Sequence, residues 1–237
     1  MIPLKSCLAS FRDPDFQNFQ RTLPLPPPAT CIGMAGAALG LSAQDAQAYF
    51  PAGEWEIGVA GYSNGQFKDL WKYDDFKIGS ILLREYLFDN YFLLVYGHED
   101  AAKIKQLRQA FTSPVYALSC GNSDSICTVR VHDMKVIDQT TESGSMRACY
   151  AEGDLIDSSL QEAAKGTTSF SIRTTSRPVA QDLPVRFEYM KDGIRMLKER
   201  RHISYIQFAT NLPIAVKGIN YQDPYHEETI FIPVFPL

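Results

Sequence analysis

The sequence lacks several features that would narrow its function at once. Its 237 residues contain no uncharged apolar run long enough to cross a membrane. The longest apolar stretch, residues 78–96, carries Arg84, Glu85 and Asp89, whereas a membrane span needs about 20 nearly uncharged residues. The N-terminus shows neither a long apolar run nor a small-residue cleavage site, so we expect no signal peptide. These absences predict a cytoplasmic protein without a membrane partner.

The cysteines do not form a recognisable disulfide or metal pattern. Their number is odd, and no two have the C-x-x-C spacing of a zinc site. We therefore expect reduced and mostly buried thiols, with no metal and no cofactor. The five are Cys7, Cys31, Cys120, Cys127 and Cys149.

The sequence also lacks a basic excess. It has 23 Lys and Arg against 27 Asp and Glu, a formal net charge of −4, which argues against a uniformly basic nucleic-acid binder. The charge is uneven, however: residues 122–162 are mainly acidic and residues 163–218 mainly basic. The basic stretch suits local contact with a polyanion, or else a solvated strand face. An apolar content of 45% excludes general disorder.

Periodicity predicts a mixed order of elements in the first half of the chain. The expected order is strand 4–12, helix 30–41, strand 55–61, one or two strands within 80–96, helix 99–111 and strand 115–119. This is the order of the ferredoxin-like, RRM-type split β-α-β fold. That fold hosts many functions, so the order alone predicts no activity.

The second half is predicted to be rich in strands. A polar segment, residues 142–165, is expected to form a loop with a short helix, and Lys191-Asp192-Gly193 marks a hairpin turn. The expected strands are 127–138, 170–174, 185–190, 194–198, 202–208 and 229–235. The fold class is therefore α+β, with an RRM-like domain in residues 1–125 and a smaller β-rich domain in residues 126–237.

Two segments of the first half have unusual compositions. The helix at 30–41 contains Gly33, Gly36 and Gly40, each costing a helix about 1 kcal/mol relative to alanine. Something must therefore approach this helix closely, either a packed sheet or a phosphate at its N-terminus. The second segment, about 62–80, mixes aromatic residues with lysines, which predicts a projecting hairpin suited to base stacking and phosphate contact, or an ordinary covering loop. Ser63-Asn64-Gly65 is its expected turn.

Three segments carry a resemblance to a known family. The first runs from Ala9-Ser10-Phe11-Arg12 through the proline-rich 23–28 to the glycine-bearing helix. The second spans the apolar 82–96, and the third is the stretch 113–123, Ser-Pro-Val-Tyr-Ala-Leu-Ser-Cys-Gly-Asn-Ser. Together they resemble the CRISPR-associated Cas-five family, RAMP-superfamily subunits of the type I Cascade surveillance complex, and are most similar to the type I-B branch.

The resemblance implies a role and partners. Such subunits cap the backbone filament, hold the 5′ handle of the guide RNA (crRNA) and take part in antiviral defence. A thumb hairpin meets the adjacent backbone subunit, and the protein contacts the large subunit, so target DNA is an indirect partner. The implied RNA-binding residues are Phe11, Arg12, Arg21, Thr30, Gly33, Gly36, Arg84, Asn122 and Ser123. The implied thumb residues are Phe67, Lys68, Trp71, Lys72 and Tyr73.

One branch of the family cleaves precursor guide RNA without a metal, using tyrosine, lysine and histidine together. Here His98 has no adjacent lysine, and His202 follows Arg201 without a partner that would make a site. We therefore expect a subunit that is not an enzyme. Two alternatives stay open: a metal-independent endoribonuclease that processes precursor crRNA, and an RRM-like protein-interaction domain without RNA.

Overall fold

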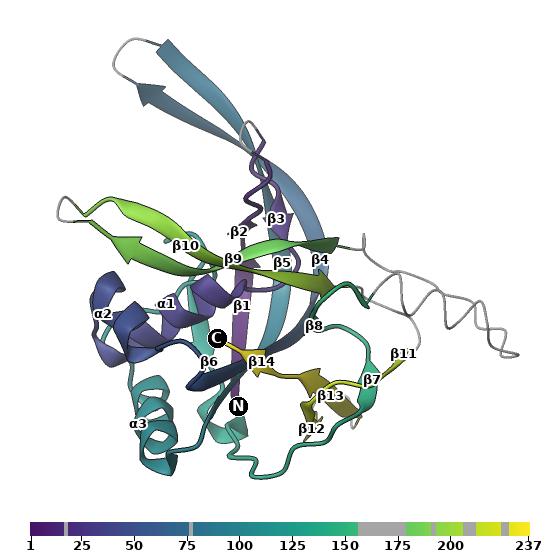
Figure 1. The fold of residues 1–237 in the computed structure, drawn as a ribbon. Coiled ribbons are helices and arrows are strands. Elements are labelled where there is room, and N and C mark those ends of the chain that lie inside the picture. The colour runs from purple at the N-terminus through teal and green to yellow at the C-terminus, as the bar shows by residue number, and fades with distance from the viewer. Residues whose placement is uncertain (17–18, 76–77, 156–178, 191–192, 206–211, 224–227) are drawn as a thin grey trace, which may run out of the picture.

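The computed structural model describes residues 1–16, 19–75, 78–155, 179–190, 193–205, 212–223 and 228–237 (Figure 1). Its main sheet has five strands in the order β14-β4-β5-β1-β6. The strands of this sheet are β1 (Ile2–Ala9), β4 (Trp55–Asp75), β5 (Ile78–His98), β6 (Cys127–Val129) and β14 (Phe235–Pro236). The helices are α1 (Pro28–Leu39), α2 (Ala43–Tyr49) and α3 (Ala101–Thr112), with a short 3-10 helix η1 (Val131–Asp133).

The smaller strands form separate pairs and one three-stranded sheet, in the order β8-β10-β9. Strands β11 and β7 form one pair, β12 and β13 a second, and β2 and β3 a third. Their bounds are β2 (Phe11–Arg12), β3 (Thr22–Leu23), β7 (Gly144–Met146), β8 (Tyr150–Glu152), β9 (Val179–Tyr189), β10 (Arg195–Tyr205), β11 (Leu212–Ile214), β12 (Gly218–Gln222) and β13 (Thr229–Pro233).

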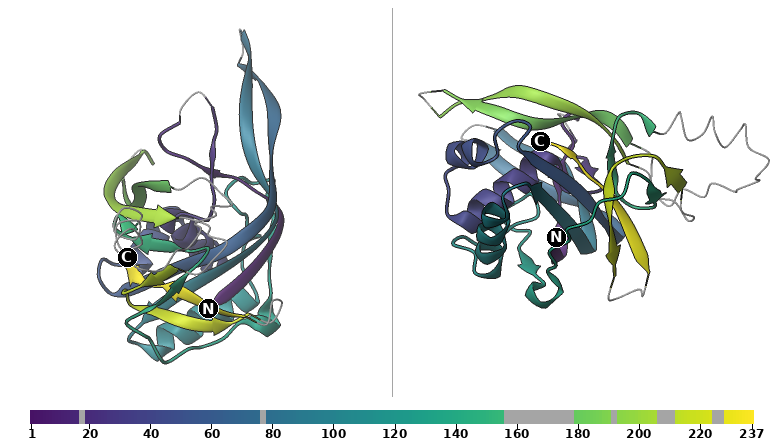
Figure 2. Two further views of the ribbon diagram at one scale, coloured as in Figure 1. Left: turned by 90° about the vertical axis from the view of Figure 1, so that its right-hand side faces the viewer. Right: turned by 60° about the horizontal axis from the view of Figure 1, so that its bottom comes forward.

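The central strand β5 is buried on both faces, which explains why residues 82–96 are almost continuously apolar. Phe92, Leu94 and Tyr96 belong to a core that also contains the buried side chains of α1 and α3. Leu93 and Val95 alternate with them and belong to a second core, which β12 and β13 complete. Side chains of a strand alternate between faces, so one strand supplies both cores. The sheet therefore lies between the helices on one face and a β-rich layer on the other (Figure 2).

A long hairpin of β4 and β5 rises far beyond the body of the molecule (Figure 2). Its two strands pair from Trp55↔His98 to Asp75↔Ile78. Gly61 lies at its root with φ +150, and a Cβ there would be 2.4 Å from the Tyr91 carbonyl oxygen. Asp89, on the opposite strand, has φ 50. The hairpin thus leaves the sheet at a place where a residue on each strand, Gly61 and Asp89, has a positive φ angle.

The loop between β2 and β3 stands beside this hairpin (Figure 1). The Gln20 N–H donates to the Leu83 carbonyl (3.0 Å), and the Glu85 N–H donates to the Gln20 carbonyl (2.8 Å). These bonds hold the loop against the outer edge of β5, above the point where pairing with β1 ends at Leu87.

A second hairpin, β9–β10, crosses over α1 (Figure 1). Its root is buried in the helix-side core through Leu183, Val185 and Ile203. The Arg186 guanidinium donates to the Phe50 carbonyl (2.6 Å), and the Phe187 N–H donates to Gln47 Oε1 (3.2 Å). The hairpin is therefore fixed to the α2 region as well as to the core.

The α+β class, the RRM-type order and the projecting hairpin are confirmed. The helix expected at 99–111 is α3, where the Asp100 side chain accepts from the Ala102 N–H as an N-cap. The single strand expected at 4–12 is divided into β1 and β2. The strand expected at 185–190 corresponds to the end of β9, and those expected at 194–198 and 202–208 merge into β10, which is described to Tyr205.

Three local predictions are wrong. Residues 115–119 form no strand apart from one bridge, Ser119↔Ile126; the strand that pairs with β1 is β6. Only the first three residues of the strand expected at 127–138 are extended, and η1 follows. Ser63-Asn64-Gly65 is not a turn but part of β4, because Ser63 and Asn64 bond across to Asn90 and Asp89. The strand expected at 170–174 and residues 156–165 of the loop expected at 142–165 lie outside the described residues. The described part of that loop, residues 142–155, instead contains the strands β7 and β8.

Strands from both halves of the chain meet in the main sheet. β6 and β14 both come from after residue 125 and pair with β1 and β4. The division into residues 1–125 and 126–237 stays a prediction, and these strands show that the two parts share one sheet. In the described part of the chain, no helix is both long and apolar enough to cross a membrane.

Candidate functional site

Five of the sequence-predicted residues meet in one groove beside α1. The groove has a volume of about 460 Å³. That lies within the range of pockets that hold small ligands, about 300–1,000 Å³. The five are Phe11, Arg12, Thr30, Gly33 and Asn122. They come from three segments that are far apart in sequence, so the fold, and not sequence proximity, assembles them.

The two glycines of α1 have different surroundings. A Cβ on Gly33 would meet nothing within 4 Å, and this exposed glycine lines the groove. A Cβ on Gly36 would lie 2.5 Å from the Cβ of Ala46 in α2. Gly36 therefore permits two helices to pack closely, and it does not line the groove. The expectation that it binds RNA is corrected on this ground.

The N-terminus of α1 satisfies much of its own backbone. Pro28 has no N–H, and the N–H groups of Thr30 and Cys31 both donate to the Pro27 carbonyl (2.9 and 3.1 Å). Free N–H groups make a helix N-terminus attractive to a phosphate. The N–H groups of Thr30 and Cys31 are already bonded, so they are not free to bind a phosphate. Thr30 lines the groove without offering its backbone N–H to a ligand.

The turn at 121–124 forms the opposite rim. Gly121 has φ +96, and a Cβ there would lie 1.9 Å from the Ser10 carbonyl oxygen. Only glycine permits this approach, which brings Asn122 next to Phe11 and Arg12. Ser123 follows as an exposed residue of the same turn. Gly121 of the Gly-Asn-Ser motif therefore has a structural role, because it lets the turn pack against Ser10 and so places Asn122 in the groove.

The second wall of the groove was not predicted from the sequence. It consists of Pro184, Phe187 and Arg195 from the β9–β10 hairpin. The turn signal at 191–193 was enough to place Arg195 near Phe187 on opposite strands. It could not show that this hairpin lies across α1, because that contact depends on burial of residues far apart in sequence.

A row of planar side chains lies along the outer part of the long hairpin. The Phe67 and Tyr86 rings stack with centroids 5.4 Å apart, and the Arg84 guanidinium lies 5.1 Å from the Tyr86 ring and 4.8 Å from the Trp71 ring. Asp124 links this row to the turn at 121–124, because it is 3.8 Å from Arg84 and accepts from the Tyr86 hydroxyl (3.0 Å).

Only the outer members of this row are accessible. Trp71 is 45% exposed and Phe67 is 41% exposed, whereas Arg84 is 8% exposed. Arg84 thus orders the aromatic rings and is not free to reach a phosphate, unlike the role expected for it. Burial and the hydrogen bond to Asp124 raise the pKa of Tyr86.

The remaining predicted residues lie apart from the groove. Arg21 is 3.9 Å from Asp13 and lies over the Phe16 ring, and Lys68 lies over the Phe19 ring. Lys72 is an exposed residue of β4, which pairs with Ile81. Tyr73 pairs with Ser80 through its backbone, and its side chain is outside the described set.

Much of the basic stretch is neutralised internally. Arg186 and Arg201 are both within 3.3 Å of Glu199, and Arg201 also bonds Glu152 (2.7 Å). Lys217 bonds Glu56 (2.7 Å). The net positive charge that this stretch presents to solvent is therefore smaller than its composition suggests. Among its basic residues, Arg195 lines the groove.

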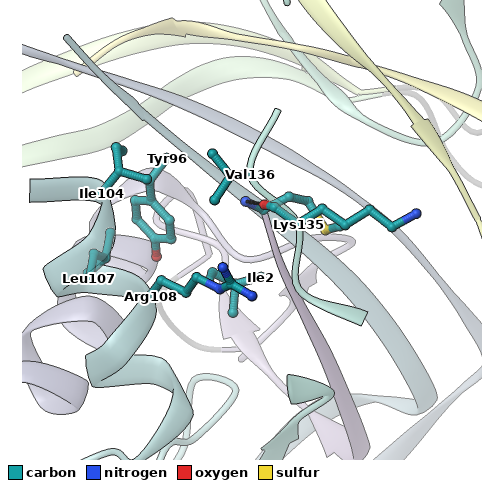
Figure 3. A pocket seen from close by; sticks show the side chains of 8 residues that line it. Ile2, Tyr96, Ile104, Leu107, Arg108, Lys135 and Val136 are labelled. Atoms are coloured by element: carbon teal, nitrogen blue, oxygen red, sulfur yellow. Dashed lines mark hydrogen bonds between the residues drawn. The ribbon is translucent and has the colours of Figure 1, made fainter. Parts of the chain in front are cut away.

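A second hollow lies near α3, on other residues. Its inner part, of about 20 Å³, is lined by Tyr96, Ile104, Arg108 and Lys135 among others (Figure 3). That volume holds about one water molecule. Its open outer part, about 820 Å³, contains paired acids: Glu54 with His98 and Lys103, and Glu56 with Lys217. No sequence-predicted site residue lines either part.

The histidines of the described chain are engaged in structural contacts or lie away from the groove. His98 Nδ1 accepts from the Asp100 N–H (2.8 Å) at the start of α3, and its ring packs on Trp55. His202 Nδ1 lies 2.8 Å from Asp182 on an exposed part of the second hairpin. Within the described residues, no group of three or more His, Cys, Asp or Glu is arranged to hold a metal ion.

Comparison with known proteins gives one family and several similar structures. The sequence matches the family model described as CRISPR-associated protein (Cas_Cas5) over residues 3–197. A search of curated proteins finds no match. A chain from a structure described as a CRISPR RNA-guided surveillance complex is 16% identical, with a TM-score of 0.54, and the match covers 91% of this chain and 92% of that one.

Two further structures have TM-scores below 0.5. One, described as type III-B Cmr-beta bound to cognate target RNA and AMPPnP, has a TM-score of 0.48 and 12% identity, over 90% of this chain and 86% of that one. A structure described as a Cas protein has a TM-score of 0.38 and 20% identity, over 90% and 93%. The structural likeness concerns the fold alone. The family match spans most of the chain, and the protein therefore belongs to the CRISPR-associated Cas5 family.

Proposed function

We propose that this protein is a subunit of a type I CRISPR surveillance complex and that it binds the 5′ handle of the guide RNA in the groove beside α1. The observation that carries the proposal is the meeting of Phe11, Arg12, Thr30, Gly33 and Asn122 in that groove. All five lie in the first and third of the segments that carry the family resemblance in the sequence. Phe11 is 1% exposed and its ring packs on Phe92, so it shapes the floor of the groove and does not offer a stacking surface. The bare helix face at Gly33 and the exposed Arg12 suit contact with a single RNA strand.

The long β4–β5 hairpin is the proposed thumb, which meets the adjacent backbone subunit. Its outer part carries exposed apolar residues that no described segment covers, such as Leu70 (69% exposed) and Ile81 (72% exposed). Exposed apolar surface of this kind marks interaction sites. Contact with the large subunit, and through it an indirect relation to target DNA, belongs to the same proposal.

We further propose that the subunit is not an enzyme. General acid–base cleavage of RNA needs a base within hydrogen-bond reach of the reacting hydroxyl. His98 uses Nδ1 to accept a backbone N–H, and neither His98 nor His202 lines the groove. Incubation of the protein with labelled repeat RNA, without metal, tests this directly. Cleavage that disappears in His98→Ala or His202→Ala would support the endoribonuclease alternative instead.

Binding is tested with RNA of the CRISPR repeat from the same genome, labelled with fluorescein and measured by anisotropy. Arg12→Ala is expected to weaken binding and to lower the slope of log affinity against log salt by about one, the effect of one lost phosphate contact. Lys105→Ala, an exposed cation beside the other hollow, is the matched control and should change neither.

The same experiment distinguishes the alternatives. Unchanged binding in Arg12→Ala would show that the groove is not the site. Absence of RNA both in this assay and in the purified complex would favour the protein-interaction domain without RNA. Recovery of RNA of a single length class with the complex is the expected result.

A further inference from the structure

The groove beside α1 has two walls, and the second comes from the far end of the chain. Phe187 and Arg195 belong to β9 and β10, and Arg195 lies two pairs nearer the hairpin tip than Phe187. The Arg195 guanidinium carbon is 4.2 Å from the centroid of the Phe187 ring. A guanidinium flat on an aromatic face is pre-arranged for stacking with a base and for hydrogen bonds to a phosphate.

Arg195 differs from Arg186 and Arg201 in having no acidic partner among the described residues, and from the exposed Arg200 in lining the groove. Arg186 and Arg201 are engaged with Glu199, and Arg201 also with Glu152. Within the described residues, Arg195 has no ion pair, is exposed and lines the groove. A cation left without an acidic partner at the edge of a groove is available to an anionic ligand.

The wall that carries Arg195 is held in place. Arg186 donates to the Phe50 carbonyl, the Phe187 N–H donates to Gln47, and Val185 is fully buried. A residue on such a support loses little conformational entropy when it binds. The Gly33 face of α1 and the turn at Asn122 lie in the same groove. A single strand that enters the groove therefore has protein on both sides.

We propose that the β9–β10 hairpin is the second wall of the RNA site and that Arg195, stacked on Phe187, binds a nucleotide of single-stranded RNA there. This inference rests on the proposed function, because it adds residues to the same groove. It assigns part of the RNA site to the C-terminal half of the chain. It also makes the site selective for single strands, because a base that stacks on Arg195 must be unpaired.

The test compares Arg195→Ala with Lys198→Ala. Lys198 is an exposed cation three residues further along the same strand, and it does not line the groove. With the fluorescein-labelled repeat RNA, Arg195→Ala should weaken binding by about tenfold, a typical effect for one lost stacking contact. Lys198→Ala should change it by less than about twofold. Both variants should melt at the wild-type temperature, because both side chains are exposed.

Two more measurements test the stacking geometry. Arg195→Lys keeps the charge but not the planar group, so its binding should stay weak, and full recovery would contradict stacking. Phe187→Leu keeps an apolar side chain but removes the ring, and it should weaken binding without loss of fold. The same RNA annealed to its complement should bind more weakly than the single strand.

The outcomes separate this inference from the proposed function. If Arg12→Ala weakens binding while Arg195→Ala matches Lys198→Ala, the second wall is refuted and the groove beside α1 remains the site. If the wild-type protein does not bind the repeat RNA, both proposals fail. If Arg195→Ala alone weakens binding, the RNA lies against the hairpin and not against Arg12.

Discussion

Gly33 and Gly36 lie three residues apart on one helix, and the structure predicts opposite effects of substituting them. Gly36→Val places atoms where Ala46 already packs, so we expect a loss of about 1–3 kcal/mol of folding free energy. Gly33→Val places its side chain in open space in the groove, so the fold should persist while RNA binding weakens. Urea unfolding and the anisotropy assay measure the two effects separately.

Gly33→Ala serves as the control for this pair. Alanine favours helix by about 1 kcal/mol over glycine, so this variant should be slightly more stable than the wild type. A large loss of stability in Gly33→Val, or retention of RNA binding by it, would contradict the assignment of this helix face to the groove.

The cysteines are predicted to differ in reactivity. Cys7 is exposed, and the other four are buried. Burial raises the pKa of the Cys149 thiol to about 12 and that of the Cys31 thiol still further. The thiolate is the reactive form, so both are almost fully protonated at pH 8. Iodoacetamide should modify Cys7 first and the rest only after unfolding, as peptide mass spectrometry can show. Equally fast labelling of Cys31 would contradict the burial.

At the scale of residues, the sequence was informative where the determinant is local. Phe11, Gly33 and Asn122 lie in the continuous motifs that resemble the family, so the resemblance indicated them as site residues. Arg195 and Phe187 were missed because no local signal says that their hairpin lies over α1. Arg84 was misassigned because its burial between Trp71 and Tyr86 depends on cross-strand pairing.

The long β4–β5 hairpin is predicted to lose protection toward its tip. Near its root, β5 pairs with both β4 and β1, whereas its outer part pairs with β4 alone apart from the Gln20 bridge. A two-stranded ribbon is marginally stable in water. Hydrogen exchange of the isolated protein should therefore be slow around Leu93 and fast around Leu70 and Ile81.

Hydrogen exchange of the assembled complex, compared with that of the isolated protein, tests the proposed thumb. If the outer hairpin meets a neighbouring subunit, exchange around Leu70 should slow in the complex. Leu70→Ser, which alters the exposed surface, should reduce recovery of the neighbouring subunit without changing the melting temperature. Uniform exchange along the hairpin, or no change on assembly, would contradict the proposed thumb.

Elements with strong periodicity were predicted well, and turns were not. α3 was found because its apolar spacing, and the acidic residues Glu99 and Asp100 that precede it, agree with a helix. The turn expected at Ser63-Asn64-Gly65 was wrong because small polar residues in a strand can pair side chain to side chain, as Asn64 does with Asp89. Residues that favour turns adopt a strand conformation instead when a long partner strand can pair with them.

For the whole molecule, residues 1–125 expressed alone should not fold. This piece would lack β6 and β14 of the main sheet, and also Tyr150 and Phe235 of the helix-side core. Unpaired strand edges and an open core favour aggregation. Circular dichroism and size-exclusion chromatography test this, with the 237-residue chain as control. A soluble, cooperatively melting fragment would show that the predicted boundary is a real domain boundary.

Only part of the layered architecture could be predicted from the sequence. The RRM-type order follows from periodicity within residues 1–111. The return of Phe235 to the edge of β4 depends on pairing across nearly the whole chain, and no local pattern encodes it. The same holds for the RNA groove, whose two walls are about 160 residues apart in sequence.

Gly61 lies at the root of the long hairpin, so the backbone angles there set the direction in which the outer hairpin projects. The arm beyond it, residues 62–75, is about 45 Å long at the usual rise of a strand. A change of about 10° in the exit angle would move the outer end by about 8 Å, more than the spacing between two strands. The absence of a side chain at Gly61, where a Cβ would clash with the Tyr91 carbonyl, thus affects the position of a surface several nanometres away.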